Sequence, residues 1–242
     1  MISFLDLIKE LIIFFIIILI PWMVFRRQIL NRTKKKYVVI IFIFYVVLSL
    51  FTQNLFPFVL VLLILQKEKK RGNKEENKLI KPLGDKKFEI ILFSFALKLI
   101  TMLITALFAI FLVKIGIEPK QQTIVDMIQT SSWIKLVFLM FVINLFAPYV
   151  EEFIFRHIFY RNFSRKYGKT IAVLISSALF MLLHFNLVSS IATFSLGVIN
   201  CIFYDKYGYK AAVLNHFITN FTSSIVLVAI KLLNNVGIAL LF

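Results

Sequence analysis

Residues 88–113 read FEIILFSFALKLITMLITALFAIFLV, and this run decides the class of fold. A helix that spans a bilayer needs about 20 predominantly apolar residues, and the run is longer than that. Its apolar residues are continuous rather than alternating, as are those of residues 11–24, which indicates helices instead of strands. Because backbone groups that face lipid must find hydrogen-bond partners within the protein, only helices or closed barrels remain. We therefore expect an all-α, multi-pass transmembrane helical bundle.

The composition of the whole chain agrees with a membrane protein. Of the 242 residues, 60% are hydrophobic and 28 are Phe, whereas only 7 are Gly and 5 are Pro. A soluble domain of this length has too little polar surface to cover so many apolar side chains. The single cysteine, Cys201, excludes an internal disulfide framework and a metal cage built from cysteines, so we expect it to fill space in a helix.

The net charge of +16 is explained by topology. Twenty-two of the 28 Lys and Arg residues lie in four hydrophilic segments, residues 26–36, 67–87, 156–169 and 206–210. Cytoplasmic loops of membrane proteins are rich in Lys and Arg, so we place these segments in the cytoplasm, with residues 67–87 as a solvated, mobile basic loop. Because no nucleic-acid recognition motif accompanies the charge, we expect no nucleic-acid partner, and contact with the lipid bilayer and its anionic head groups instead.

With these segments on one side, the chain makes eight membrane passes and both of its ends lie outside. The run that begins the chain lacks a basic leader and a small-residue cleavage site, so it is expected to stay attached as the first helix. The expected passes are residues 1–25, two short helices that form a hairpin within 37–66 and turn near 52–57, and residues 88–113, 133–150, 170–185, 187–204 and 211–233. We divide the chain into an N-terminal transmembrane region, residues 1–130, and a C-terminal membrane core, residues 131–236.

Ionisable side chains interrupt the apolar sequence of this core. Each costs roughly 2.5–3.5 kcal/mol at the centre of a bilayer even on lenient scales. Residues 148–156 read PYVEEFIFR. On a helix, Glu152 and Arg156 are i,i+4 neighbours and can pair, whereas Glu151 points about 100° away. One carboxylate can therefore be structural while the other is free for chemistry, although a salt-bridged helix end at the interface explains the pattern equally well.

Two further helices carry polar pairs at the same spacing. Phe180 and His184 share one helix face, and so do His216 and Asn220. A lone histidine in an apolar helix is more often a packing residue, and His216 with Asn220 suits either contacts between helices or a pair of donors for an oxyanion. Taken together, a carboxylate pair, two histidines and an asparagine on three helices indicate an active site.

These residues resemble, in order, the three motifs of the CPBP family: Glu151-Glu152-x-x-x-Arg156, Phe180-x-x-x-His184 and His216-x-x-x-Asn220. That family comprises CAAX-processing type II (Rce1-like) endopeptidases together with bacteriocin-processing and abortive-infection (Abi) membrane proteins. The resemblance covers roughly residues 133–232, so the core is expected to be catalytic. His157 departs from the pattern, since the family usually has glycine there, and we expect it to crowd the helix or to add a titratable group near the site.

The resemblance implies an intramembrane endopeptidase. Glu151 would act as the general base with His184 as its partner, and His216 with Asn220 would stabilise the oxyanion. The residues Glu152, Arg156 and Phe180 would support them. Such a site needs no metal, and we expect no cofactor. The alternative is a zinc ion held by Glu151, His184 and His216, which fit a catalytic zinc site by count.

The substrate is expected to be a peptide or protein in or at the membrane. The Lys-, Ile-, Asn- and Phe-rich composition is typical of an AT-rich bacterial genome, which favours a bacterial plasma membrane and a peptide precursor or bacteriocin over a prenylated protein. The alternative function is a catalytically inactive family member that serves in immunity or as a regulatory scaffold. A proton-coupled transporter is a third class, but the polar groups lie only in the C-terminal half and the sequence has no paired repeats with broken helices.

The expected helix ends conflict with this site. At 1.5 Å per residue, Glu151 lies about 27 Å from the outer end of its helix, and His184 lies about 21 Å from the inner end of its own. Either the helix that bears Glu151 continues through Arg161, or the next helix begins later or tilts.

Overall fold

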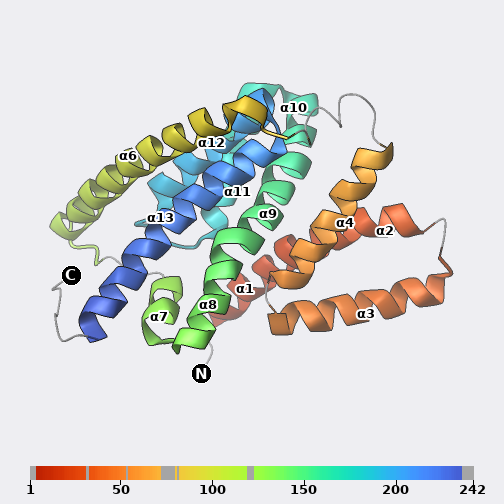
Figure 1. Ribbon diagram of the computed structural model, residues 1–242, viewed down its shortest axis with the longest axis horizontal. Helices are drawn as coiled ribbons and strands as arrows, with labels where there is room; N and C mark the ends of the chain where they lie inside the picture. Colours follow the sequence, from red (N-terminus) through yellow and green to blue (C-terminus); the bar gives the residue numbers. More distant parts are fainter. Residues whose placement is uncertain are drawn as a thin grey trace.

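The structure, a computed structural model, describes residues 4–30, 33–52, 54–71, 80, 82–118 and 123–235. Within these ranges every regular element is a helix, which confirms the all-α prediction (Figure 1). The two chain ends, whose side of the membrane was predicted, and nine residues of the predicted basic loop (residues 72–79 and 81) lie outside the described residues.

Each of the eight predicted apolar segments is helical. The N-terminal half consists of α1 (Phe4–Ile13), the π-helix η1 (Phe14–Leu19), α2 (Ile20–Ile29), α3 (Lys35–Thr52), α4 (Leu55–Arg71), the 3-10 turn η2 (Gly84–Lys86) and α6 (Lys87–Lys114). The C-terminal half consists of α7 (Thr123–Thr130), α8 (Trp133–Phe141), the π-helix η3 (Val142–Phe146), α9 (Ala147–Glu152), the π-helix η4 (Phe153–Tyr160), α10 (Arg161–Tyr167), α11 (Lys169–Leu183), α12 (Ser190–Tyr207) and α13 (Tyr209–Asn235).

Five of the helical segments are long and apolar enough to cross a bilayer, namely residues 4–29, 35–52, 84–114, 133–167 and 209–234. Helix α11 is apolar but shorter. Large apolar side chains are exposed along these segments, among them Phe51 at 83% and Ile134 at 88%, as expected of surfaces that face lipid. The fold is therefore that of a multi-helix membrane protein with five candidate spans, and the count of eight passes stays a prediction.

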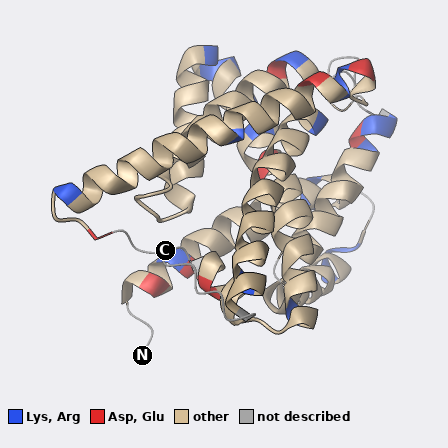
Figure 2. Cartoon of the chain, turned by 60° about the vertical axis from the view of Figure 1, so that its left-hand side comes forward, with Lys and Arg blue, Asp and Glu red and all other residues tan. Residues whose placement is uncertain are grey.

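Basic residues cluster at helix ends. Many Lys and Arg residues follow the edge that is formed by α10, the end of α4 and the start of α6 (Figures 1 and 2). The ammonium group of Lys67 in α4 donates to the backbone carbonyl of Gln28 in α2, so these two helices end side by side. This contact agrees with a shared side for the basic segments 26–36 and 67–87. Helix α4 continues to Arg71, so the first residues of the predicted loop are helical.

A single rod, residues 133–167, passes through the middle of the bundle and joins α8, η3, α9, η4 and α10. In its most apolar stretch 39% of the residues are buried, compared with 6% for the rod 84–114 at the edge. The predicted end at Val150 is wrong, because Phe153, Ile154 and Phe155 are completely buried and extend the apolar contact surface. The helix continues past Arg161, and this removes the conflict between the depths of Glu151 and His184.

Two glycines make the sharp corners that bring later helices back along the central rod. Gly168 (φ 84°) ends α10 and Gly208 (φ 92°) ends α12, and the next helix begins one residue later in each case. Glycine adopts this left-handed conformation without steric cost because it has no Cβ. The corners place α13 beside α9 and α11 beside η4, so that both polar pairs lie along the central rod.

Candidate active site

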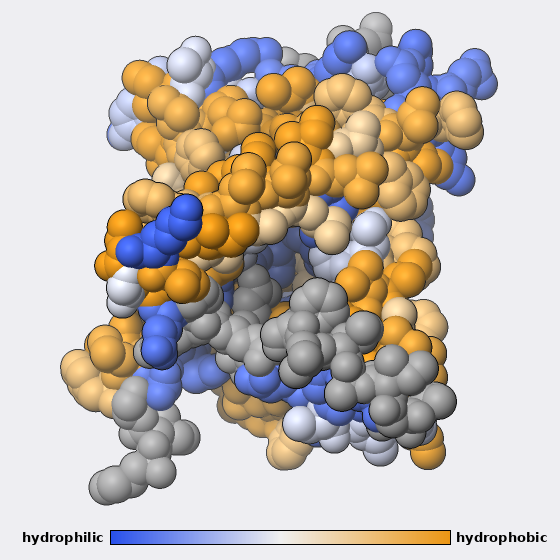
Figure 3. Space-filling view, turned by 90° about the vertical axis from the view of Figure 1, so that its left-hand side faces the viewer, coloured by the Kyte–Doolittle hydropathy of each residue, from blue (hydrophilic) through white to orange (hydrophobic). Residues whose placement is uncertain are grey.

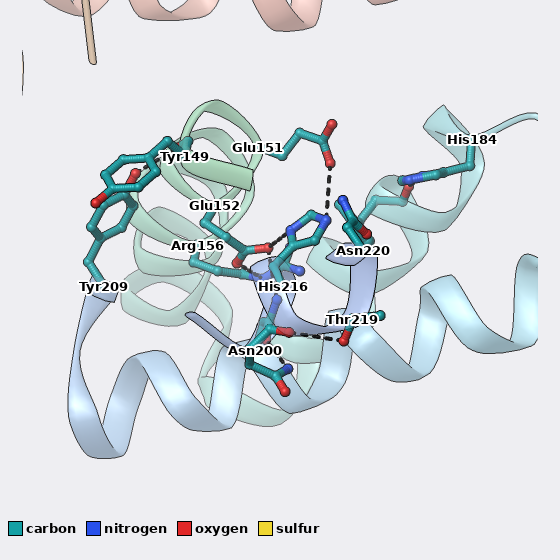
Figure 4. Close-up of polar contacts among 12 residues, drawn as sticks. Tyr149, Glu151, Glu152, Arg156, His184, Asn200, Tyr209, His216, Thr219 and Asn220 are labelled. Atoms are coloured by element: carbon teal, nitrogen blue, oxygen red, sulfur yellow. Dashed lines mark hydrogen bonds and ion pairs between the residues drawn. The ribbon is translucent and has the colours of Figure 1, made fainter. Parts of the chain in front are cut away.

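Glu152 lies at the C-terminal end of α9 and is completely buried (Figure 4). Its Oε2 is 3.0 Å from Nε of Arg156, whose side chain is also completely buried. Its Oε1 accepts a hydrogen bond from Nδ2 of Asn200 at 2.9 Å and lies 2.8 Å from Nδ1 of His216. The predicted pair of Glu152 and Arg156 is confirmed, and it forms the centre of a polar cluster contributed by three helices.

The guanidinium group of Arg156 packs against the aromatic ring of Phe180. It lies 4.7 Å from the ring centroid of Phe180, a distance typical of a cation–π contact. Phe180 is completely buried, and its ring centroid is 4.7 Å from that of His184 and 5.6 Å from that of His216. The three predicted supporting residues therefore form one packed group that touches both histidines.

His216 lies between the two glutamates. Its Nδ1 faces Glu152, and its Nε2 is 3.8 Å from Oε2 of Glu151, which is longer than a hydrogen bond. A carboxylate that pairs with arginine is ionised and only accepts, so Nδ1 of His216 carries a proton. This fixes the ring and leaves Nε2 as the atom that faces Glu151.

Glu151 points away from its neighbour and into a cavity of about 940 Å³ (Figure 4). The side chain of Glu151 is 16% exposed, compared with 0% for Glu152. The rest of the wall is largely apolar and comes from α6, α7, α8, η3 and α13. Figure 3 shows a recess with hydrophilic side chains below an apolar band of the surface. All four predicted catalytic residues line this cavity: Glu151, His184, His216 and Asn220.

His184 lies on the cavity wall at the end of α11. Its Nδ1 is 2.8 Å from the carbonyl oxygen of Phe180, and because a carbonyl only accepts, Nδ1 carries the proton and Nε2 of the neutral ring holds a lone pair. The next residue, Phe185, has a φ of 46°, a left-handed conformation that ends the helix and leaves His184 exposed. Among the described residues, Glu151 pairs with His216 and not with His184.

Asn220 lies one helical turn after His216 on α13. Its Nδ2 donates to the carbonyl oxygen of Ile143 in η3 at 3.0 Å. An amide nitrogen carries two hydrogens, so one N–H remains for a ligand in the cavity. The π-helix η3 thus orients the side chain that the sequence predicts as an oxyanion donor.

The sequence reasoning missed two buried amides, Asn200 on α12 and Asn215 on α13. Nδ2 of Asn215 donates to Oδ1 of Asn200 at 2.6 Å, and Asn200 donates in turn to Glu152. Both are almost completely buried. The sequence feature that could have identified them is an amide side chain within an apolar segment. Asn220 shows the same feature.

His157 faces away from the cavity. Its Nδ1 is 2.8 Å from the hydroxyl of Tyr204, and its Nε2 is 2.9 Å from Oε2 of Glu68 on α4. The ring also stacks on Phe153 at a centroid distance of 5.5 Å. His157 therefore adds no titratable group to the cavity, and it fits within the wider π-helical turns of η4.

Within the described residues, no three His, Cys, Asp or Glu side chains are arranged to hold a metal ion. The zinc alternative requires Glu151, His184 and His216 to converge on one point. His184 lies apart from the other two (Figure 4), so this set does not fit the ion as it is placed. A metal-free reaction therefore stays a prediction.

A glutamate, two histidines and an asparagine line one cavity within a bundle of apolar helices, as the resemblance to intramembrane proteases implies. In agreement, residues 133–222 match the profile of the family described as type II CAAX prenyl endopeptidase, Rce1-like. This part of the chain is similar to the Rce1-like family of membrane proteases, and the matched residues include every predicted site residue. No curated protein and no solved structure gave a significant match.

Proposed function

We propose that the protein is an intramembrane endopeptidase that hydrolyses a peptide bond of a membrane-associated peptide or protein with an activated water molecule. One observation carries the proposal. Two adjacent glutamates have opposite surroundings: Glu152 is enclosed and paired with Arg156, whereas Glu151 faces a cavity that His184 also lines. A carboxylate without a strong partner, next to a space that can hold a substrate, is suited to proton transfer.

In the proposed reaction, Glu151 takes a proton from a water molecule as the oxygen attacks the scissile carbonyl carbon. Nε2 of His184 accepts a hydrogen bond from the same water and orients it. Glu151 then gives the proton to the departing amine, which completes the hydrolysis with all atoms accounted for. General acid–base catalysis of this kind typically contributes about 10²–10⁴-fold to a rate.

The negative charge that develops on the carbonyl oxygen is stabilised from α13. The remaining N–H of Asn220 and, in the protonated ring, Nε2–H of His216 donate to this oxygen. Glu152 holds His216 through Nδ1, and the carbonyl of Ile143 holds Asn220, so both donors are oriented before the substrate arrives.

We also propose that all eight apolar segments cross the membrane, with the four basic segments in the cytoplasm, and that the membrane is a bacterial plasma membrane. Support comes from the shared edge of α2 and α4 and from the basic residues at helix ends. In this arrangement the cavity lies within the apolar part of the protein, so its substrate reaches it from the lipid or the outer interface.

The function is tested with the full chain purified into lipid nanodiscs. A library of apolar peptides is incubated with it, and mass spectrometry identifies new peptide ends. We expect Glu151→Gln, His184→Ala and His216→Ala each to slow cleavage at least about 100-fold. A chelator should leave the rate unchanged, and elemental analysis of the active protein should show no stoichiometric zinc.

Wild-type cleavage rates in all three variants would contradict the catalytic assignment. Binding of a partner peptide that survives all three substitutions, without cleavage by the wild type, would favour the scaffold alternative.

A further inference from the structure

Lys98 lies in the middle of α6, within an otherwise apolar span. Ionisable side chains at such depth are costly and are retained where they serve a function. Most of α6 faces outward, with Leu99 and Leu103 at 65% and 63% exposure, but Lys98 is largely buried and lines a cavity inside the protein. Lys98 also lies outside the residues that match the family.

The ammonium group of Lys98 has no carboxylate partner within the described part of the chain. A second lysine in an apolar helix differs from Lys98 in its contacts. Lys231 on α13 is 6% exposed, and its Nζ donates to the carbonyl oxygens of Ile128, Gln129 and Ser131 at 2.8, 2.9 and 2.5 Å. Lys231 holds the end of α7 in place. Lys98 makes no such contact within the described residues, and it lines a cavity.

This second cavity has a volume of about 160 Å³. Ordinary ligand sites occupy roughly 300–1,000 Å³, so the space suits the end or a single side chain of a ligand rather than a continuing chain. Its wall is rich in hydroxyl and amide groups, namely Thr101, Ser189, Thr193, Asn215, Thr219 and Ser223.

The two cavities meet at the proposed active site. His184, His216 and Asn220 line both the small cavity with Lys98 and the large cavity with Glu151. A substrate that lies across these three side chains therefore has its scissile bond between an apolar chamber on one side and a lysine on the other.

We infer that Lys98 binds a carboxylate of the substrate, so that the protein acts on acidic or free-acid peptide ends. The inference rests on the proposed function. A cation in a medium of low dielectric constant attracts an anion strongly, and a carboxylate is the anion that peptides carry. The carboxylate comes either from the C-terminus of the substrate or from an Asp or Glu side chain.

Binding of three blocked dipeptides distinguishes these sources. The probes are N-acetyl-Leu-Phe as the free acid, N-acetyl-Leu-Phe amide, and N-acetyl-Asp-Phe amide, titrated calorimetrically against the full-length Glu151→Gln protein in nanodiscs. We expect at least one carboxylate probe to bind about 10–100-fold more tightly than the neutral amide. Preference for the free acid identifies the C-terminus, and preference for the aspartyl probe identifies a side chain.

The variants assign the preference to Lys98. Lys98→Met should abolish it, and Lys98→Arg should retain it. Lys114→Met removes the same charge from the exposed end of the same helix and should leave the preference intact. If Lys98→Met does not fold, as judged by gel filtration and tryptophan fluorescence, Lys98→Gln replaces it.

Equal binding of all three probes by the protein with Lys98 would overturn the inference, as would an acid preference that persists in folded Lys98→Met. Failure of the proposed function looks different. There the Glu151, His184 and His216 variants cleave like the wild type, while the acid preference still depends on Lys98.

Discussion

The two sides of α9 differ in how completely their polar groups are paired. On one side, Glu152 faces Arg156, His216 and Asn200, each within 3.0 Å. On the other side, Glu151 has one polar contact with the described residues, to His216 at 3.8 Å, and it borders open space. A buried carboxylate with several close polar partners fixes the positions of helices, whereas one that borders a cavity retains capacity for a ligand. Two adjacent positions of one helix, about 100° apart around its axis, thus hold a carboxylate that is enclosed and one that faces a cavity.

The largest effect on stability is expected from exchanging the two glutamates for glutamine one at a time. Glu152→Gln should lower the free energy of unfolding by about 3–5 kcal/mol, because it leaves the buried charge of Arg156 uncompensated. Glu151→Gln should change it by less than about 0.5 kcal/mol, since the side chain borders a cavity. Reversible unfolding in mixed detergent micelles measures both values.

The double variant Glu152→Gln/Arg156→Met provides the matched control and should recover part of the loss, because no buried charge remains. Equal destabilisation by the two single glutamate variants would show that the two sides of α9 do not differ.

A smaller effect is expected from Asn200→Ala. The substitution removes a donor from Glu152 and an acceptor from Asn215, both buried, so the free energy of unfolding should fall by about 1–3 kcal/mol. Thr222→Val, which removes a hydroxyl that donates within its own helix, is the control and should cost less. If both variants lower the free energy of unfolding equally, the hydrogen bond between Asn200 of α12 and Glu152 of α9 does not stabilise the protein.

Another small effect is expected at the edge of the bundle. Glu68 contacts His157, but its side chain is 19% exposed, so Glu68→Gln should cost no more than about 1 kcal/mol. Cleavage should keep its wild-type rate, because His157 faces away from the cavity. A loss of activity with unchanged stability would show instead that α4 controls the site, and steady-state kinetics beside the unfolding measurement separates these outcomes.

Much of the fold follows from the sequence because apolar runs and charge clusters are local features. All eight runs are helices, and Glu152 pairs with Arg156 as the i,i+4 spacing predicts. The end of the central helix was mispredicted because the basic segment from Arg156 onward looks like a loop, although the helical rod continues to Tyr167. Local sequence does not contain the neighbours that bury residues 153–155.

The sequence pointed to four residues that the structure places around one cavity, but it did not indicate their contacts. Which partner Glu151 faces depends on how α9 and α13 are rotated against each other, and no spacing within one helix encodes that rotation. The sequence analysis did not identify Lys98 as a site residue for another reason. One charge barely changes the average of a long apolar run, and the segment 84–114 still has a mean hydropathy of 2.5 over its best window.

The π-helical turns on either side of α9 affect how homologues of this protein can be found by sequence searches. In η3 and η4 the backbone bonds reach one residue further than in an α-helix, so each turn can gain or lose a residue while the flanking helix stays intact. Evolution can therefore change the residue count between Trp133 and Arg156 and still present the same side chains to α13. A search pattern with fixed spacing would miss homologues that differ by one residue in such a turn. A pattern that allows a single-residue gap at each turn would find them.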